Sequence, residues 1–181
     1  GDGKTSLLLR LIADLQEESE DKTRVAFLDH PTLTAPQMIR EITRQLTLGK
    51  VSRDKIHNLN LLREHLKKLK EEGYKAIAIV DEGQMLAHRP DLLQELRILL
   101  NLCSNDSFLL TFIFSGQKAL EGAIRRMPEF WQRLPVRFFL GNLSINDTKG
   151  LIKYRLQKSG IEEKEIFTDK AYEGIYRFSQ G

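Results

Sequence analysis

The first candidate functional residues are Gly3, Lys4 and Thr5, in the opening stretch GDGKTSLLLRLI. They match the second half of the phosphate-binding pattern G-x-x-x-x-G-K-[ST]. In that pattern backbone N–H groups surround the phosphates, the lysine neutralises their charge and the threonine hydroxyl binds Mg²⁺. The match alone is a weak signal, because a glycine that begins an ordinary helix looks the same. We expect the strand and the first glycine of the full pattern to precede Gly1.

A second signal comes from the stretch AIAIVDEGQ, in which an apolar run ends in Asp81 and Glu82. Continuous apolar runs are typical of strands buried on both sheet faces, and ligands of open α/β folds bind at the carboxyl ends of such strands. Asp81 at that edge can hold Mg²⁺, usually through water, and Glu82 can polarise an attacking water. Two acids closing an apolar strand favour a bound cation over a simple polar strand end.

Taken together, the two signals predict a binding site for ATP and Mg²⁺. We expect Lys4 to neutralise the β- and γ-phosphates and Thr5 and Asp81 to hold the metal. Glu82 is the predicted catalytic residue that activates water. The phosphate-contacting segment is Gly1, Asp2, Gly3, Lys4, Thr5 and Ser6.

Polar residues also follow the next apolar run, in TFIFSGQKAL. Ser115 and Gln117 would lie between the carboxylate strand and the phosphate loop, where a polar group can sense the γ-phosphate or orient the water. A polar strand terminus explains either residue equally well, so both remain candidates.

The elements that must position these residues alternate between helices and strands. Helical spacing of apolar residues predicts helices at 5–19, 34–46, 59–69 and 91–102, and β-prone runs predict strands at 24–29, 76–82, 108–116 and 136–140. This alternation indicates an α/β fold with a mostly parallel sheet and helices on both faces. Helices at 144–156, after the capping box of Ser144 and Asp147, and at 168–178 suggest a second, helical domain. We place the domains at 1–142 and 143–181.

Composition and charge narrow the class of protein further. Lys and Arg number 28 and Asp and Glu 25, so the net charge of +3 is too small to argue for nucleic acid by itself. Cys103 is the only cysteine, which excludes an internal disulfide, and we expect it to be buried. No apolar run approaches the roughly 20 residues of a membrane span.

These motifs, in this order, resemble the AAA+ ATPases of the general-secretion-pathway protein A type, a subgroup that also takes in ATPases regulating transposition. The pieces that carry the resemblance are GKT, IAIVDEGQML, LLTFIFSGQKAL and FWQRLPVRFFLGNLS, and it extends over essentially the whole chain.

The resemblance implies a cytoplasmic P-loop ATPase in which Lys4, Thr5, Asp81 and Glu82 are the Walker residues, with the sensor at Ser115 or Gln117. It also implies a ring or dimer in which an arginine, Arg133 or Arg137, completes the site of a neighbouring subunit. Secretion-machinery assembly is the process that it favours. A DNA-dependent ATPase that regulates transposition, and a nucleotide-binding scaffold with little turnover, are the alternatives.

Overall fold

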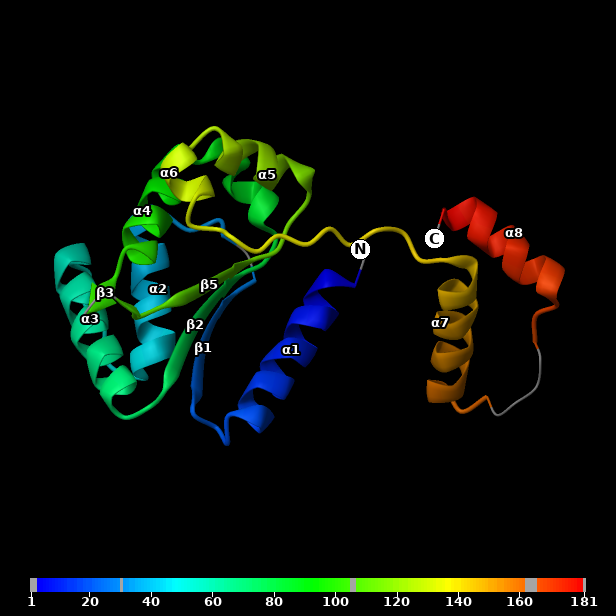
Figure 1. The fold of residues 1–181 in the computed structure, drawn as a ribbon, viewed down its shortest axis with the longest axis horizontal. Helices are drawn as coiled ribbons and strands as arrows, with labels where there is room; N and C mark the ends of the chain where they lie inside the picture. The colour runs from blue at the N-terminus through cyan, green and yellow to red at the C-terminus, as the bar shows by residue number, and fades with distance from the viewer. Residues whose placement is uncertain (1–2, 30, 105–106, 162–165, 181) are drawn as a thin grey trace. The chain divides into compact units, whose positions relative to one another are not determined.

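The computed structural model describes residues 3–29, 31–104, 107–161 and 166–180. The chain divides into two compact units, Gly1–Pro135 and Val136–Gly181, and each is described by itself below (Figure 1). The domain boundary expected from the sequence, between residues 142 and 143, lies within the second unit.

The first unit is built on a three-stranded parallel sheet with strand order β1–β2–β5. The central strand β2 pairs in parallel with β1 on one side and with β5 on the other, so all carboxyl ends meet at one edge (Figure 1). The predicted α/β fold with a parallel sheet is therefore confirmed. The strands are β1 (Thr23–Leu28), β2 (Lys75–Val80) and β5 (Thr111–Phe114).

One face of the sheet is covered by α1 (Lys4–Glu18). Leu8 of this helix packs on Ile77 and Ile79 of β2, with Ile12 and further apolar side chains around them. Since side chains alternate between the faces of a strand, Ile77 and Ile79 point to the side opposite Ala76, Ala78 and Val80. The helix that follows the GKT motif is thus held on the sheet by its own apolar stripe.

The other face carries the larger hydrophobic core, formed with helices α2, α3 and α4. Ala78 and Val80 of β2 belong to this core, and both are fully buried. Pro90 begins α4, where its missing N–H costs nothing. The helices are α2 (Ala35–Thr47), α3 (Lys55–Glu71) and α4 (Pro90–Leu100).

Short elements connect the strands and complete this unit. A 3₁₀ helix, η1 (Gly83–His88), follows β2 directly, and α5 (Lys118–Arg125) and α6 (Pro128–Trp131) follow β5. Between α4 and β5 the chain forms a small antiparallel hairpin of β3 (Cys103–Ser104) and β4 (Ser107–Phe108).

Three expectations from the sequence are corrected by the structure. The strand predicted at residues 108–116 begins only at Thr111, because Phe108 pairs with Cys103 in the hairpin. Cys103 is exposed rather than buried for the same reason. The predicted strand at 136–140 has no strand partner within the described residues, and Val136 and Phe138 are 68% and 88% exposed. β-prone residues alone do not form a strand, because backbone N–H and C=O groups need a neighbouring ladder.

The second unit contains two helices in its described part, α7 (Ile145–Lys158) and α8 (Asp169–Ser179). Ser144 caps α7 through its hydroxyl, which accepts a hydrogen bond from the Asp147 N–H, and the Asp147 carboxylate accepts one from the Ser144 N–H. The capping box read from the sequence is thus present. Lys149 of α7 pairs with Asp169 of α8, which joins the two helices at their amino ends.

Candidate functional site

The two motifs singled out in the sequence meet at the carboxyl edge of the sheet. Thr5, in the first turn of α1, donates a hydrogen bond from Oγ1 to Oδ2 of Asp81 at 2.5 Å, across 76 positions of the sequence. Asp81 follows β2 directly, and its N–H donates to the Leu28 carbonyl of β1. The parallel register of β1 and β2 therefore fixes Asp81 where the amino end of α1 arrives.

The helix α1 begins directly after a glycine in a left-handed backbone conformation. Gly3 has φ +69°, in the left-handed region that favours glycine, and it directly precedes the first helical residue, Lys4. N–H groups in the first turn of a helix lack intrahelical partners and point outward, so they attract anions. Ser6 is exposed in this same turn. Gly1 and Asp2, also expected to contact phosphates, lie outside the described residues.

The electrostatics of Asp81 favour its charged form. The residue is 2% exposed, and burial alone would raise its pKa. The pKa is nevertheless held below its ordinary value, because the hydroxyls of Thr5 and Ser115, the Glu82 N–H and the positive charge of Lys4 all stabilise the carboxylate. Asp81 is thus an ionised, buried acid with Lys4 nearby, which suits a metal ligand.

Glu82 lies beside Asp81 in an unusual backbone conformation. Its φ of 50° and ψ of 33° are left-handed values that non-glycine residues rarely adopt, and such conformations persist only where their surroundings enforce them. The Glu82 N–H donates to Oδ1 of Asp81 at 2.9 Å, and its carboxylate accepts a hydrogen bond from Gln84 at 2.5 Å. Glu82 as a whole is half-buried.

The structure separates the two sensor candidates. Ser115 directly follows β5, and its N–H donates to the Val80 carbonyl at 2.9 Å. The Ser115 hydroxyl is near enough to help lower the pKa of Asp81, yet it is buried without a formed hydrogen bond among the described residues. Gln117 is exposed at the start of α5, and its backbone N–H donates to Gln84. Ser115 is the residue that joins the Asp81 cluster.

One arginine candidate, Arg133, makes its printed contact away from this cluster. The guanidinium of Arg133 lies 5.5 Å from the centre of the Phe108 ring, a cation–π contact. Phe108 precedes β5, so this contact is at the opposite end of the strand from Ser115. Arg137 belongs to the second unit and is described only with it.

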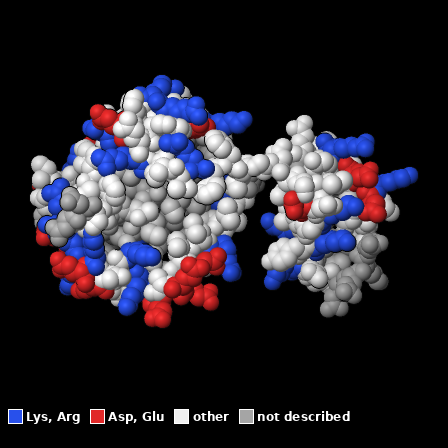
Figure 2. All heavy atoms as spheres, in the orientation of Figure 1, with Lys and Arg blue, Asp and Glu red and all other residues white. Residues whose placement is uncertain are grey.

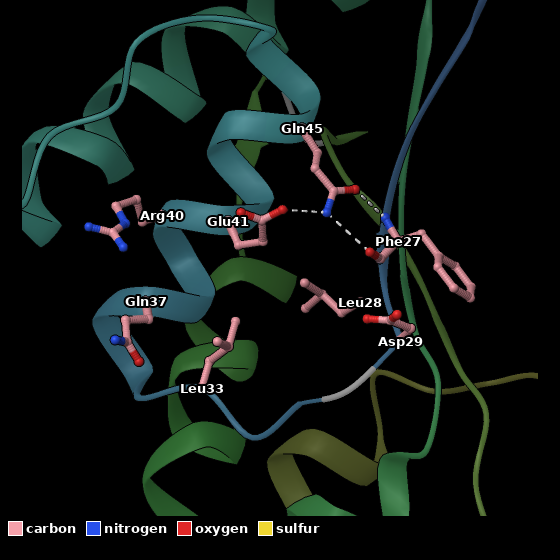
Figure 3. A pocket seen from close by; sticks show the side chains of 8 residues that line it. All are labelled: Phe27, Leu28, Asp29, Leu33, Gln37, Arg40, Glu41 and Gln45. Atoms are coloured by element: carbon pink, nitrogen blue, oxygen red, sulfur yellow. Dashed lines mark hydrogen bonds between the residues drawn. The ribbon is translucent and has the colours of Figure 1, made fainter.

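A separate hollow of about 280 Å³ lies between β1 and α2 (Figure 3). Its polar side chains already have partners. The Gln45 side chain accepts a hydrogen bond from the Phe27 N–H and donates one to the Phe27 carbonyl, so it pairs with the free edge of β1. Glu41 accepts two hydrogen bonds from Arg44. None of the residues that meet at the Thr5–Asp81 contact lines it. We therefore assign it no chemistry.

The residues present fit a magnesium nucleotide. A hydroxyl and a carboxylate that lie next to each other can both become ligands of one ion bound beside them, and oxygen atoms are the ligands that Mg²⁺ prefers. The buried, unbonded hydroxyl of Ser115 beside them is a further polar group ready for a ligand or water. Within the described ranges no three His, Cys, Asp or Glu side chains converge.

Sequence reasoning missed one residue of this site, Gln84. The sequence DEGQ carried the signal, because a glutamine two positions after Glu82 can reach back to it in a tight turn.

Among the described residues no helix is long and apolar enough to cross a membrane.

Comparison with known proteins identifies relatives of this site and fold. Residues 1–124 match the AAA domain family. The chain is 32% identical over 187 residues to general secretion pathway protein A of Aeromonas hydrophila, a match that covers 100% of this chain. The chain spans only 32% of the length of this curated relative.

Two solved structures of the Aeropyrum pernix ORC2 protein have a similar fold. One holds ADPNP–ADP complexes and the other is the ADP form, with TM-scores of 0.66 and 0.65. Each is 20% identical to this chain and covers 87% of it, while this chain covers 43% of theirs. At this identity the likeness concerns the fold alone.

Proposed function

Because this chain belongs to the AAA domain family, we propose that it binds ATP together with Mg²⁺ and hydrolyses it. The family predicted from the sequence motifs is confirmed, since both the family match and the secretion-pathway relative agree with it. We propose, beyond the family, ATP hydrolysis as the reaction, Mg²⁺ as its metal and the residues named below as those that perform it.

The observation that carries the proposal is the hydrogen bond between Thr5 and Asp81, with Glu82 directly beside it. A Thr hydroxyl at a helix amino end and a buried Asp at a strand carboxyl end are brought together from distant parts of the chain. A capped strand end needs no such partner, and a pure nucleotide binder has no need for the second acid. The arrangement therefore favours an enzyme over a scaffold.

Each residue has a distinct task in this proposal. The first-turn N–H groups of α1 and the Lys4 ammonium bind the β- and γ-phosphates, and Thr5 and Asp81 hold the metal. When bound, Mg²⁺ neutralises charge that develops on the phosphate oxygens. Glu82 accepts a proton from the attacking water, and the Ser115 hydroxyl donates a hydrogen bond to the γ-phosphate or the water. In this proposal Gln117 contributes only its backbone N–H, which donates a hydrogen bond to Gln84.

Self-association and a trans-acting arginine remain part of the proposal. Arg133 is held on Phe108, away from the Thr5–Asp81 contact of its own subunit, which suits a residue that serves a neighbour. Arg137 is the second candidate for this role. We propose that hydrolysis drives a conformational switch of the oligomer, and the relative's name supports secretion-pathway assembly as the process that it serves. The proposed location is the cytoplasm, where ATP is available.

A DNA-dependent ATPase receives no comparable support. On the face shown in Figure 2, Lys and Arg side chains are scattered among uncharged ones and interrupted by Asp and Glu, so this face carries no continuous basic surface. The net charge of +3 is small for a protein of this length. Duplex binding that weakens steeply with salt and stimulates turnover would single this function out.

The test of nucleotide binding is the substitution Lys4→Ala in the full-length protein. Loss of a charge-assisted contact to phosphate should weaken magnesium-dependent ATP binding by roughly 10–150-fold. Titration calorimetry measures this, with Lys153→Ala, an exposed lysine of α7, as the matched control. Unchanged affinity in Lys4→Ala, relative to the control, would remove Lys4 from the site.

A further inference from the structure

Gln84 is a polar side chain beside Glu82 to which the proposed reaction gives no task. It lies in η1, two residues beyond Glu82, and is half-buried. Its Nε2 donates to Oε2 of Glu82 at 2.5 Å, while its Oε1 accepts from the Gln117 N–H at 3.1 Å. One side-chain amide thus joins the carboxylate to the loop that follows β5.

The orientation of this amide is fixed by chemistry. A carboxylate only accepts hydrogen bonds, and a backbone N–H only donates them. If the amide were turned over, its oxygen would face the Glu82 carboxylate and its NH₂ group would face the Gln117 N–H. Both contacts would then be repulsive, so a single orientation satisfies both neighbours.

The backbone around Gln84 is packed too closely to move independently of the β5 loop. The Gly83 N–H donates to the Ser115 carbonyl at 2.8 Å. A Cβ at Gly83 would lie 2.9 Å from that same carbonyl, and a Cβ at Gly116 would lie 3.0 Å from the Gln84 nitrogen and 3.1 Å from its Oε1. The glycines make room for the amide, and they bring the loop with Ser115 against η1.

We propose that Gln84 is a positioning residue, which holds the Glu82 carboxylate in place and ties it to the loop that carries Ser115. This inference rests on the proposed ATPase function. Glu82 leaves its strand through a strained, left-handed backbone, so its side chain depends on neighbouring contacts for a fixed position. Gln84 supplies that contact, and it couples the orientation of Glu82 to the position of the β5 loop.

The main test is a double-mutant cycle in the full-length protein with Gln84→Met and Glu82→Gln. Met keeps the length of the side chain but makes neither hydrogen bond, so kcat should fall about tenfold or more while the affinity for ATP stays unchanged. In the Glu82→Gln background the same substitution should change turnover by less than about twofold, because the carboxylate that it positions is gone. Gln157→Met, on the exposed surface of α7, is the control.

Two further variants separate the two hydrogen bonds without relying on turnover. Gln84→Glu keeps an acceptor for the Gln117 N–H but cannot donate to Glu82, whereas Gln84→Lys donates to Glu82 but cannot accept. Hydrogen exchange over residues 112–120 should therefore quicken in Gln84→Lys and Gln84→Met and stay slow in Gln84→Glu. Equal exchange in all variants would contradict the link to the loop.

The kinetic measurements distinguish a failure of the proposed ATPase mechanism from a failure of the positioning role of Gln84. If Glu82→Gln turns over at the parental rate, the proposed ATPase mechanism fails and the role of Gln84 fails with it. If Glu82→Gln is impaired but Gln84→Met has parental or raised kcat, only the positioning role is overturned. A loss of the same size in both backgrounds also overturns it, since Gln84 would then act through general stability.

Discussion

The close approach of η1 to the β5 loop makes Gly83 the most informative position for a stability test. A Cβ added there would lie 2.7 Å from Cδ2 of Leu120 and 2.9 Å from the Ser115 carbonyl. The Leu120 methyl can turn away, but the carbonyl is backbone and already accepts the Gly83 N–H at 2.8 Å. Gly83→Ala must therefore push η1 and the loop apart.

Overpacking of this kind costs about 1–3 kcal/mol of unfolding free energy. For a chain of this size that corresponds to a fall in Tm of roughly 2–12 °C. The matched control is Gly122→Ala, in α5, where an added Cβ meets nothing within 4 Å. Because Ala favours a helix over Gly, this control should be stabilised by up to about 1 kcal/mol.

Urea unfolding followed by the fluorescence of Trp131 measures both variants. Trp131 is the only tryptophan and packs against the core of the first unit, so its signal reports on that unit. Opposite signs for Gly83→Ala and Gly122→Ala, at unchanged m-value, are the expected result. Equal stability in the two variants would refute the close packing of η1 on the β5 loop, and with it the structural basis for coupling Gln84 to Ser115.

Further predictions concern Asp81 and the arginines. The pKa of Asp81 is lowered from 3.8, so its ionisation stabilises the fold above that pH, and this contribution is lost as pH falls through the lower, folded-state pKa. As the pH falls below about 4, the unfolding free energy of Asp81→Asn, measured by urea titration, should therefore decrease less than that of the parent. ATP binding by Asp81→Asn should also depend less on magnesium. If Arg133 or Arg137 acts in trans, its Ala variant should lose about 10³–10⁵-fold in turnover and regain part of it when mixed with Lys4→Ala subunits. Normal turnover in both arginine variants would leave a monomeric ATPase.

The sequence predicted the parallel sheet, and the approach of Thr5 to Asp81, where the local pattern was strong. The run ending in Asp81 has one reading, because an all-apolar strand with terminal acids fits only a doubly covered parallel sheet. The apolar stripe after Thr5 likewise predicted a helix, and the contact of Thr5 with Asp81 follows from strand order and helix direction. Alternating elements and the order of motifs were enough for the family.

The failures have physical causes that lie beyond local pattern. Val136 and its apolar neighbours have strand composition, but strand formation depends on a partner that composition does not reveal. Phe108 reads as part of the following strand, whereas pairing in the hairpin draws it away and exposes Cys103. The role of Gln84 depends on glycines from two separate segments, and such a long-range fit leaves no periodic signal.

We propose that Glu82 activates the attacking water in a site that binds ATP through other residues. The most direct measurement compares magnesium-dependent ATP binding and ATP hydrolysis in the full-length protein and its Glu82→Gln variant. The amide keeps the shape of the side chain but cannot accept the proton, so hydrolysis should fall about 10²–10⁴-fold while ATP affinity stays the same. Hydrolysis at the parental rate in Glu82→Gln would contradict the claim.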